Sequence, residues 1–298
     1  MKLITYSTFA KSHQPGLLVD DAVFPVPFAS MLDLIAAGEK GLARARRAAE
    51  GKRIPLADVQ LHSPIDRPPT LRDAYAFEQH VRAANANRGR EVPEEWYKFP
   101  VFYFTNPANI FGPDDVIPYP PYTNELDYEL EVAVVVGKAG RDIAAEDAPK
   151  HIFGLTVFND WSARDVQREE MKVRLGPAKG KDFASALGPC IVTLDELAGR
   201  LTDRPAVFDM EMRARVNGTE RSRGNLKDIH WSFGEILARA SESVMLNPGD
   251  VIGSGTVGTG CLLELTRAKG PWLQPGDEVE LEIDGVGILK NVVGRKGA

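Results

Sequence analysis

The sequence predicts a mixed β fold with some α structure, arranged as a mixed β-sandwich roll and preceded by a small N-terminal α+β domain. Long segments of strand type fill the second half of the chain. Few helical segments separate them, which argues against a doubly wound parallel sheet. A proline-rich stretch, HSPIDRPPT at 62–70, indicates a domain edge. We therefore expect an N-terminal domain over residues 1–65 and a main domain over residues 66–298.

The N-terminal region combines short strand candidates with one helix candidate. The strand-like pieces are KLITYS at 2–7, GLLVD at 16–20 and AVFPV at 22–26. Helical character extends over 30–51 and begins at Ser30, a residue type that caps helix N-termini. After the proline-rich stretch, helical spacing is compatible with the segment from Leu71 to His80.

Strands dominate the remainder of the chain after two loop regions rich in Pro, Asn and Asp, at 91–100 and 106–125. The expected strands are ELEVAVVVG at 129–137, IFGLTVFND at 152–160, CIVTLDEL at 190–197, FDMEMRARVNGT at 208–219, DVIGSGT at 250–256, CLLELTR at 261–267 and DEVELEIDGVGILK at 277–290. Helices are expected at 161–171 and 232–245.

Composition excludes several classes of protein. The net charge of −6, from 36 basic and 42 acidic residues, gives no electrostatic reason to expect nucleic acid as a partner. No apolar run approaches the roughly 20 residues that span a membrane, and the first residues do not resemble a signal peptide. We therefore expect no membrane partner and a cytoplasmic location. Cys190 and Cys261 are isolated, which predicts small buried side chains rather than a disulfide or a zinc site.

Acidic residues open the apolar strand candidate LDYELEVAVVVG at 126–137. The strand period of two places Asp127, Glu129 and Glu131 on the same face as Ala133 and Val135. Partly desolvated carboxylates about 7 Å apart repel each other and take up protons unless a cation lies between them. If the acids of the chain converge, their all-oxygen site suits Mg²⁺, Ca²⁺ or Mn²⁺ better than zinc.

Four further candidate residues can also be interpreted from their local pattern. Asp160 lies between a strand and a helix, where a helix cap is the favoured interpretation. Asp73 and His80 are seven residues apart, two turns along one face if their segment is helical. Glu264 lies among aliphatic residues, and an outward-facing strand position explains it as well as a buried functional acid does.

The sequence motifs give no support for a nucleotide-binding site or for a common hydrolase site. GSGTVG at 253–258 matches G-x-G-x-x-G, but the strand expected in CLLELT stands where a dinucleotide site needs a helix. There is no P-loop, no H-E-x-x-H and no G-x-S-x-G.

A series of motifs resembles the fumarylacetoacetate hydrolase family over residues 66–298. The motifs are RDAYAFEQH, LDYELEVAVVVG, FNDWSARDVQ, LGPAKGKDF and GSGTVGTGCLLEL. The resemblance implies an FAH-like fold for the catalytic domain and a homodimer. It also implies a metal-dependent hydrolase, with Mg²⁺ (or Ca²⁺ or Mn²⁺) as cofactor, that cleaves a C–C bond in a 2,4-diketo acid such as an acylpyruvate or a fumarylacetoacetate-like substrate.

Carried over position by position, the resemblance assigns roles to single residues. The implied metal ligands are Asp73, Glu129, Glu131 and Asp160. His80 would be the general base that activates water, oriented by Glu264. Developing negative charge would be stabilised by Arg164, Gln167 and Lys181. The implied substrate contacts are Tyr75, Arg88, Tyr103, Gln167, Lys181 and Thr256, the last together with neighbouring glycine amides.

Some of these positions keep a plain structural alternative. For Arg164 it is an ion pair on a helix surface, and for Tyr103 it is core packing. The loop after the helix at 161–171 lacks a tyrosine of the family pattern and offers Met171 or Lys172 instead. The acyl half of the substrate is therefore expected to differ.

Two alternative functions stay open. A metal-dependent 2-oxo acid decarboxylase or tautomerase of the same family would need no hydrolytic water, although the presence of both His80 and Glu264 favours hydrolysis. The other alternative is a non-catalytic, metal-stabilised binding protein.

Overall fold

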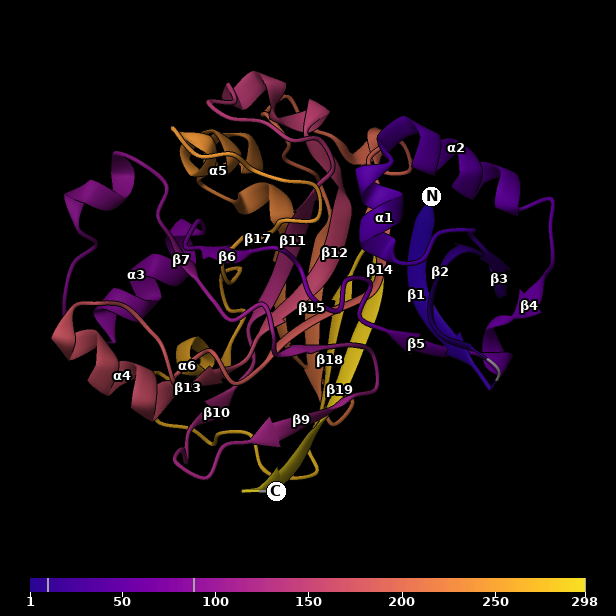
Figure 1. Ribbon diagram of the computed structural model, residues 1–298. Coiled ribbons are helices and arrows are strands. Elements are labelled where there is room, and N and C mark those ends of the chain that lie inside the picture. Colours follow the sequence, from indigo (N-terminus) through magenta and orange to yellow (C-terminus); the bar gives the residue numbers. More distant parts are fainter. Residues whose placement is uncertain (10, 88, 298) are drawn as a thin grey trace.

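Two packed β-sheets form the body of the protein (Figure 1). The computed structural model describes residues 1–9, 11–87 and 89–297, so the predicted substrate contact Arg88 lies outside the described residues. Within these residues the larger sheet has twelve strands and the smaller has five, and β10 and β13 form a separate ribbon. This arrangement confirms the predicted mixed β fold with few helices and a small N-terminal α+β part.

The larger sheet has the order β4-β3-β2-β1-β14-β12-β11-β17-β6-β7, with β5 beside β1 and β8 beside β14. Its strands are β1 (Lys2–Thr8), β2 (Lys11–Val19), β3 (Ala22–Pro25), β4 (Ile54–Pro55), β5 (Gln60–His62), β6 (Leu71–Ala74), β7 (Phe102–Phe104), β8 (Ile110–Phe111), β11 (Leu130–Val136), β12 (Ile152–Asp160), β14 (Ser185–Thr193) and β17 (Val251–Gly253).

The smaller sheet has the order β16-β15-β18-β19-β9. Its strands are β9 (Val116–Tyr119), β15 (Glu211–Val216), β16 (Thr219–Asn225), β18 (Glu278–Ile283) and β19 (Gly287–Lys296), and the ribbon consists of β10 (Leu126–Asp127) and β13 (Ser162–Ala163). The α-helices are α1 (Met31–Ala36), α2 (Gly38–Ala48), α3 (Glu78–Ala86), α4 (Arg164–Val173), α5 (Phe233–Ser241) and α6 (Leu262–Leu265). Short 3-10 helices span Leu56–Asp58, Glu94–Tyr97, Ala145–Lys150, Ala198–Arg200 and Leu226–Asp228.

Strand β11 is buried on both faces, which explains its continuous apolar run. Val132 and Val134 belong to the core between the sheets, where β11, β12 and β14 pack against β15, β18 and β19. Ala133 and Val135 belong to a second core cluster, which lies beneath α1. Because side chains alternate along a strand, Glu131 lies on the face of Ala133 and Val135. Tyr128 and Glu129 belong to no strand and lie between the end of β10 and the start of β11.

The segment from Leu71 to His80 is not one helix, as its spacing allowed, but a strand followed by a helix. Leu71 and Asp73 in β6 pair in parallel with Val251 and Gly253 in β17. This pairing satisfies the backbone of β6 in the sheet, so tertiary structure overrides the helical spacing. The prediction that Asp73 and His80 share a helical face is therefore wrong.

The predicted helices are partly confirmed. Ser30 caps α1 through the Asp33 amide, but the segment 30–51 divides at Ala37 into α1 and α2. Helix α5 begins at a capping box formed by Ser232 and Glu235. Helix α4 begins only at Arg164, and Asp160 ends β12, so the helix-cap interpretation of Asp160 is wrong.

The segment CLLELTR is not a strand, because a distant carboxylate fixes it as the short helix α6. The amides of Leu262 and Leu263 donate to Asp127 at 2.8 and 3.0 Å. Asp127 therefore satisfies two N–H groups that have no partner inside a helix. Glu264 consequently lies on this helix and not on an outward strand position.

The N-terminal strands extend the larger sheet, because β1 pairs with β14 at Lys2 and Val192. The boundary between residues 65 and 66 stays a prediction. In the described part of the chain, no helix is both long and apolar enough to cross a membrane.

Candidate active site

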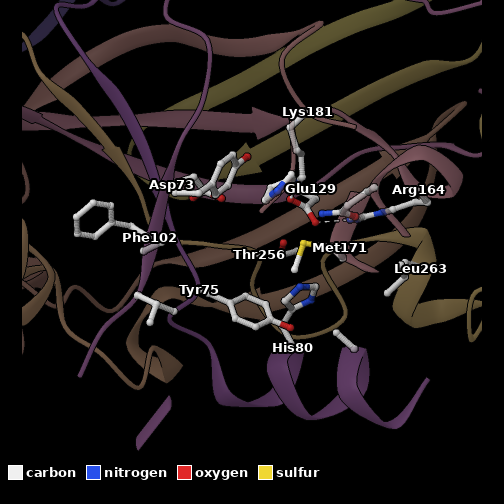
Figure 2. A pocket seen from close by; sticks show the side chains of 16 residues that line it. Asp73, Tyr75, His80, Phe102, Glu129, Arg164, Met171, Lys181, Thr256 and Leu263 are labelled. Carbon is white, nitrogen blue, oxygen red and sulfur yellow. Dashed lines mark hydrogen bonds and ion pairs between the residues drawn. The ribbon is translucent and has the colours of Figure 1, made fainter. Parts of the chain in front are cut away.

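A cavity of about 240 Å³ lies where β6, α3, α4 and α6 meet (Figure 2). Many of the predicted site residues line it. They are Asp73, Tyr75, His80, Tyr103, Glu129, Arg164, Gln167, Lys181 and Thr256. The remaining lining is apolar and consists of Ala74, Ala84, Val101, Phe102, Met171, Pro177 and Leu263.

Three buried acids converge beside this cavity. Asp73, Glu129 and Glu131 each offer a carboxylate oxygen within 4.8 Å of the others. Gly253, the sheet partner of Asp73, makes the approach feasible, since a Cβ at this glycine would lie 2.4 Å from Asp73 Oδ1. The Gly255 amide also donates to Asp73 Oδ1 at 3.1 Å. The glycine-rich turn therefore positions the carboxylate of Asp73. The Gly255 amide is used for this contact and is not available to bind substrate.

Two buried cations, Lys181 and Arg164, form ion pairs with acids of this region. Lys181 Nζ lies 2.5 Å from Glu129 and 2.6 Å from Asp160. Arg164 lies 2.8 Å from Asp127 and 2.8 Å from Glu129. The alternative that Arg164 forms a surface ion pair is wrong, because its side chain is 3% exposed.

The protonation equilibria of the acids differ because the two cations reach only some of them. Burial alone would raise the pKa of Glu129, but Lys181 and Arg164 hold that pKa below its ordinary value. Burial and the charges of Asp73 and Glu129 raise the pKa of Glu131 well above its ordinary value. Burial, followed by the charge of Asp160, raises the pKa of Asp73 to about 8. Among the described residues, no lysine or arginine forms an ion pair with Asp73 or Glu131, so burial dominates their protonation.

The donor set fits a divalent cation. Glu131 Oε2 and Asp160 Oδ1 are buried and have no hydrogen-bond partner among the residues that the structure describes. Buried polar atoms without partners are rare, and carboxylate oxygens are the ligands that Mg²⁺, Ca²⁺ and Mn²⁺ prefer. Asp73, Glu129 and Glu131 would hold such an ion, with the partnerless oxygen of Asp160 as a further donor.

Asp160, the fourth implied metal ligand, lies outside the converging group of three. Its Oδ2 accepts hydrogen bonds from Lys181 and from the Tyr103 hydroxyl. Burial, and then the charge of Asp160, raise the pKa of Tyr103 well above its ordinary value, so this hydroxyl stays protonated and donates. Tyr103 therefore orients Asp160 as well as lining the cavity.

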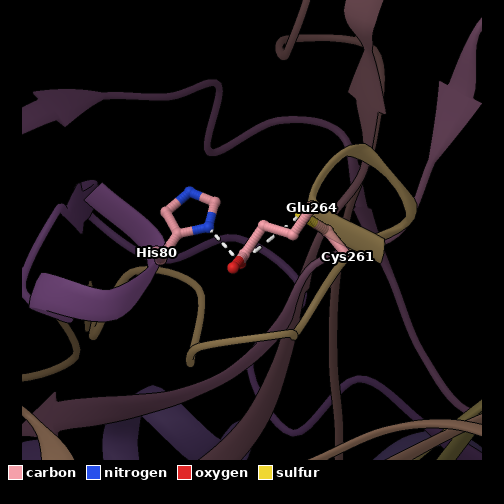
Figure 3. A group of neighbouring side chains, drawn as sticks. All are labelled: His80, Cys261 and Glu264. Atoms are coloured by element: carbon pink, nitrogen blue, oxygen red, sulfur yellow. Dashed lines mark hydrogen bonds and ion pairs between the residues drawn. The ribbon is translucent and has the colours of Figure 1, made fainter. Parts of the chain in front are cut away.

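His80 and Glu264 form the hydrogen-bonded pair that the resemblance implies (Figure 3). His80 Nδ1 lies 2.5 Å from Glu264 Oε1, and both side chains are buried. The Thr259 amide donates to the second oxygen of Glu264 at 3.1 Å. Since Nδ1 faces a carboxylate, Nε2 is the basic nitrogen of the ring. Cys261 lies 3.9 Å from Glu264 Oε1, and burial raises the pKa of its thiol, so it remains a neutral neighbour.

Helix α4 contributes three residues to the cavity, and they lie on one helical face. Arg164 Nη1 donates to Gln167 Oε1 at 3.2 Å, and Met171 follows one turn later. Lys172 pairs with Glu169 at 2.7 Å and does not line the cavity. Of the two residues offered in place of the family's tyrosine, Met171 is thus the one at the site.

Two supporting roles were missed in the sequence. Asp127 joins Arg164 to the start of α6, and the Thr259 amide fixes Glu264. The strand period of two placed Asp127 on the same face as Glu129, so the sequence already indicated that Asp127 lies near the site. Thr259 gave no signal, because its contribution comes from a backbone amide.

Comparison with known proteins identifies relatives along most of the chain. A family model described as fumarylacetoacetate (FAA) hydrolase C-terminal matches residues 70–294. The oxaloacetate tautomerase YisK of Bacillus subtilis is 32% identical over 279 residues, which cover 89% of this chain and 86% of that protein. The human mitochondrial oxaloacetate tautomerase FAHD2A is 32% identical over 282 residues, covering 93% of this chain and 84% of the relative.

A solved structure agrees with these relatives. The fumarylacetoacetate hydrolase of Exiguobacterium antarcticum superposes with a TM-score of 0.77 at 28% identity, and the match covers 99% of each chain. The fold, the family model and the sequence relatives lead to one conclusion. The chain belongs to the fumarylacetoacetate hydrolase family.

Proposed function

We propose that this protein is a divalent-metal-dependent enzyme that moves a proton between the keto and enol forms of a 2-oxo acid. One observation carries the proposal: His80, paired with Glu264, faces the same cavity as the carboxylates of Asp73 and Glu129. Removal of a proton next to a carbonyl needs a positioned base and an electrophile for the carbonyl oxygen. An imidazole beside an oxygen-rich cation site meets both needs.

A divalent cation held by Asp73, Glu129 and Glu131 would supply polarisation of the substrate carbonyl, which makes the adjacent C–H bond more acidic. His80 Nε2 takes the proton from C3, and the electron pair of the broken C–H bond forms the C2–C3 double bond. The π-electron pair of the carbonyl moves to its oxygen, which gains a proton from water, and the imidazolium of His80 returns its proton to water, so the enol has the same composition as the ketone. Glu264 stabilises the imidazolium of His80 during the transfer and keeps the ring oriented.

The relatives support this reaction class. Both sequence relatives described above are named as oxaloacetate tautomerases, and their similarity extends over the region that supplies the cavity. Oxaloacetate is a 2-oxo acid with protons on C3, so it suits the proposed transfer.

Hydrolysis of a C–C bond in a 2,4-diketo acid is the second candidate function. The observation that favours it is the His80–Glu264 pair, because an imidazole oriented by a carboxylate also activates water. The solved relative is named as a fumarylacetoacetate hydrolase. In this reaction the same nitrogen takes its proton from water instead of from C3.

The test follows the ultraviolet absorbance of enol-oxaloacetate with Mg²⁺, Mn²⁺ or Ca²⁺ present. His80→Ala should slow the catalysed conversion by about 10²- to 10⁴-fold. His151→Ala is the control, because His151 contacts the Lys138 carbonyl away from the cavity. Full activity of His80→Ala contradicts the proposal, as does a lack of keto–enol catalysis on both oxaloacetate and phenylpyruvate with each of the three ions. Pyruvate release from acetylpyruvate, detected by mass spectrometry, identifies the hydrolase instead.

A further inference from the structure

The face of α4 that lines the cavity is charged at its start and apolar near its end. Arg164 at its start is 3% exposed and belongs to the buried ionic network. Met171 near its end is 39% exposed, and its thioether is directed into the cavity (Figure 2). The spacing of seven residues keeps both on one face of the helix. A substrate that extends from the ionic end along this face would therefore meet Met171 with its distal part.

The surface beside His80 continues this apolar character. Ala84 lies one turn after His80 on α3 and lines the cavity together with Leu263 of α6. Ala84 and Leu263 belong to one buried cluster, against which the Tyr75 ring packs. Apolar groups bound here lose contact with water without losing hydrogen bonds.

Among the described residues, the two cations of the lining belong to the buried ionic network and not to the apolar part of the cavity. Among the described lining residues, the lysine and arginine side chains are those of Arg164 and Lys181, and each already contacts two buried carboxylates. Lys172, the residue after Met171, is paired with Glu169 outside the cavity. A carboxylate that leaves water for such a surface loses hydration without a compensating charge.

Building on the proposed function, we propose that Ala84, Met171 and Leu263 form a subsite for an apolar substituent on C3 of the substrate. The favoured substrate class is then a 2-oxo monocarboxylate with an alkyl or aryl group, and a 2-oxo dicarboxylate is disfavoured.

Binding of 2-hydroxy analogues tests the subsite without depending on turnover. Phenyllactate and malate share the 2-hydroxy acid group and differ in the distal phenyl or carboxylate. Calorimetric titration with Mg²⁺ should give wild-type protein a dissociation constant at least tenfold lower for phenyllactate. Met171→Lys places a cation in the subsite and should shift this ratio at least tenfold toward malate. Val173→Lys adds the same charge on the same helix at a residue that is 77% exposed and outside the cavity, and should leave the ratio unchanged.

The subsite is overturned if the wild type binds malate as tightly as phenyllactate or more tightly. It is also overturned if Met171→Lys leaves the ratio of the two dissociation constants at the wild-type value. Keto–enol conversion of phenylpyruvate and oxaloacetate is measured in parallel. If phenyllactate is preferred but neither acid is interconverted, the proposed reaction fails while the subsite stands. If both acids are interconverted but malate binds as tightly as phenyllactate, the subsite fails while the reaction stands.

Discussion

Lys181 and Arg164 compensate carboxylates that have lost their hydration. Both cations are buried, and they share Glu129 while each contacts a further acid, Asp160 for Lys181 and Asp127 for Arg164. Replacement of one buried partner leaves the other charged and unpaired, which costs about 3–5 kcal/mol, whereas an exposed pair contributes about 0–1 kcal/mol. The two arginines of α4 represent these two cases.

Arg164→Met should therefore lower the free energy of unfolding by about 3–5 kcal/mol, because Asp127 and Glu129 would lose a buried cation. Arg168→Met is the matched control on the same helix, since Arg168 is 44% exposed and its partner Glu125 lies outside the helix. Its cost should stay within about 1 kcal/mol. Urea unfolding measures both, and equal costs for the two variants would contradict the assigned buried network.

Glu264→Gln separates orientation of the base from binding of substrate. The amide keeps the size of the side chain but removes the charge that stabilises imidazolium at His80. We expect kcat to fall by about 10²- to 10⁴-fold with little change in KM. Steady-state kinetics measures the two constants. An unchanged kcat would show that Glu264 does not assist the proton transfer.

At the scale of elements, helix ends are fixed partly by neighbours in sequence and partly by distant residues. Ser232 and Glu235 cap α5 locally, a pattern that can be recognised in the sequence. Asp127 satisfies the start of α6 from 135 residues away, so no local pattern predicts that helix. The segment from Leu71 to His80 was misjudged for a similar reason, because its strand depends on pairing with β17.

Ser232→Ala should lower the free energy of unfolding by about 0.5–2 kcal/mol, because the Glu235 amide loses its acceptor. Glu235→Gln keeps an acceptor oxygen for the Ser232 amide and should cost less than Ser232→Ala. Both are compared by denaturant midpoint at constant m-value. A larger loss for Glu235→Gln would mean that the negative charge of Glu235, and not the box, stabilises the helix start.

At the scale of the whole molecule, the site is predictable only where residues near in sequence remain near in space. The period of two placed Glu131 on one face with Ala133, and the motif order associated His80 with Glu264. The pairing of Asp73 with Gly253 was not predictable from periodicity, because local patterns do not encode which distant strands become neighbours. The commitment of Lys181 to Glu129 and Asp160 also required the folded chain.

A divalent cation should stabilise the whole fold, because it compensates acids that come from separate strands. At a hundredfold excess over its Kd, the ion should add about 2.7 kcal/mol to the free energy of unfolding. Thermal unfolding with Mg²⁺ or Mn²⁺, and then with EDTA, measures the effect. Asp73→Asn should weaken the response, and Asp147→Asn, which alters an exposed acid paired with Lys150, should retain it. An identical response in both variants would place the stabilising ion elsewhere.

The parallel contact between β6 and β17 has a consequence for biosynthesis. Asp73 and Gly255 are 182 residues apart, and ribosomes add about 5–20 residues per second. For roughly 10 to 40 s the nascent β6 has no neighbour on this edge. A polypeptide that ends between His80 and Gly255 contains the imidazole of His80. It lacks both Glu264, which orients that ring, and the glycine-rich turn that positions Asp73.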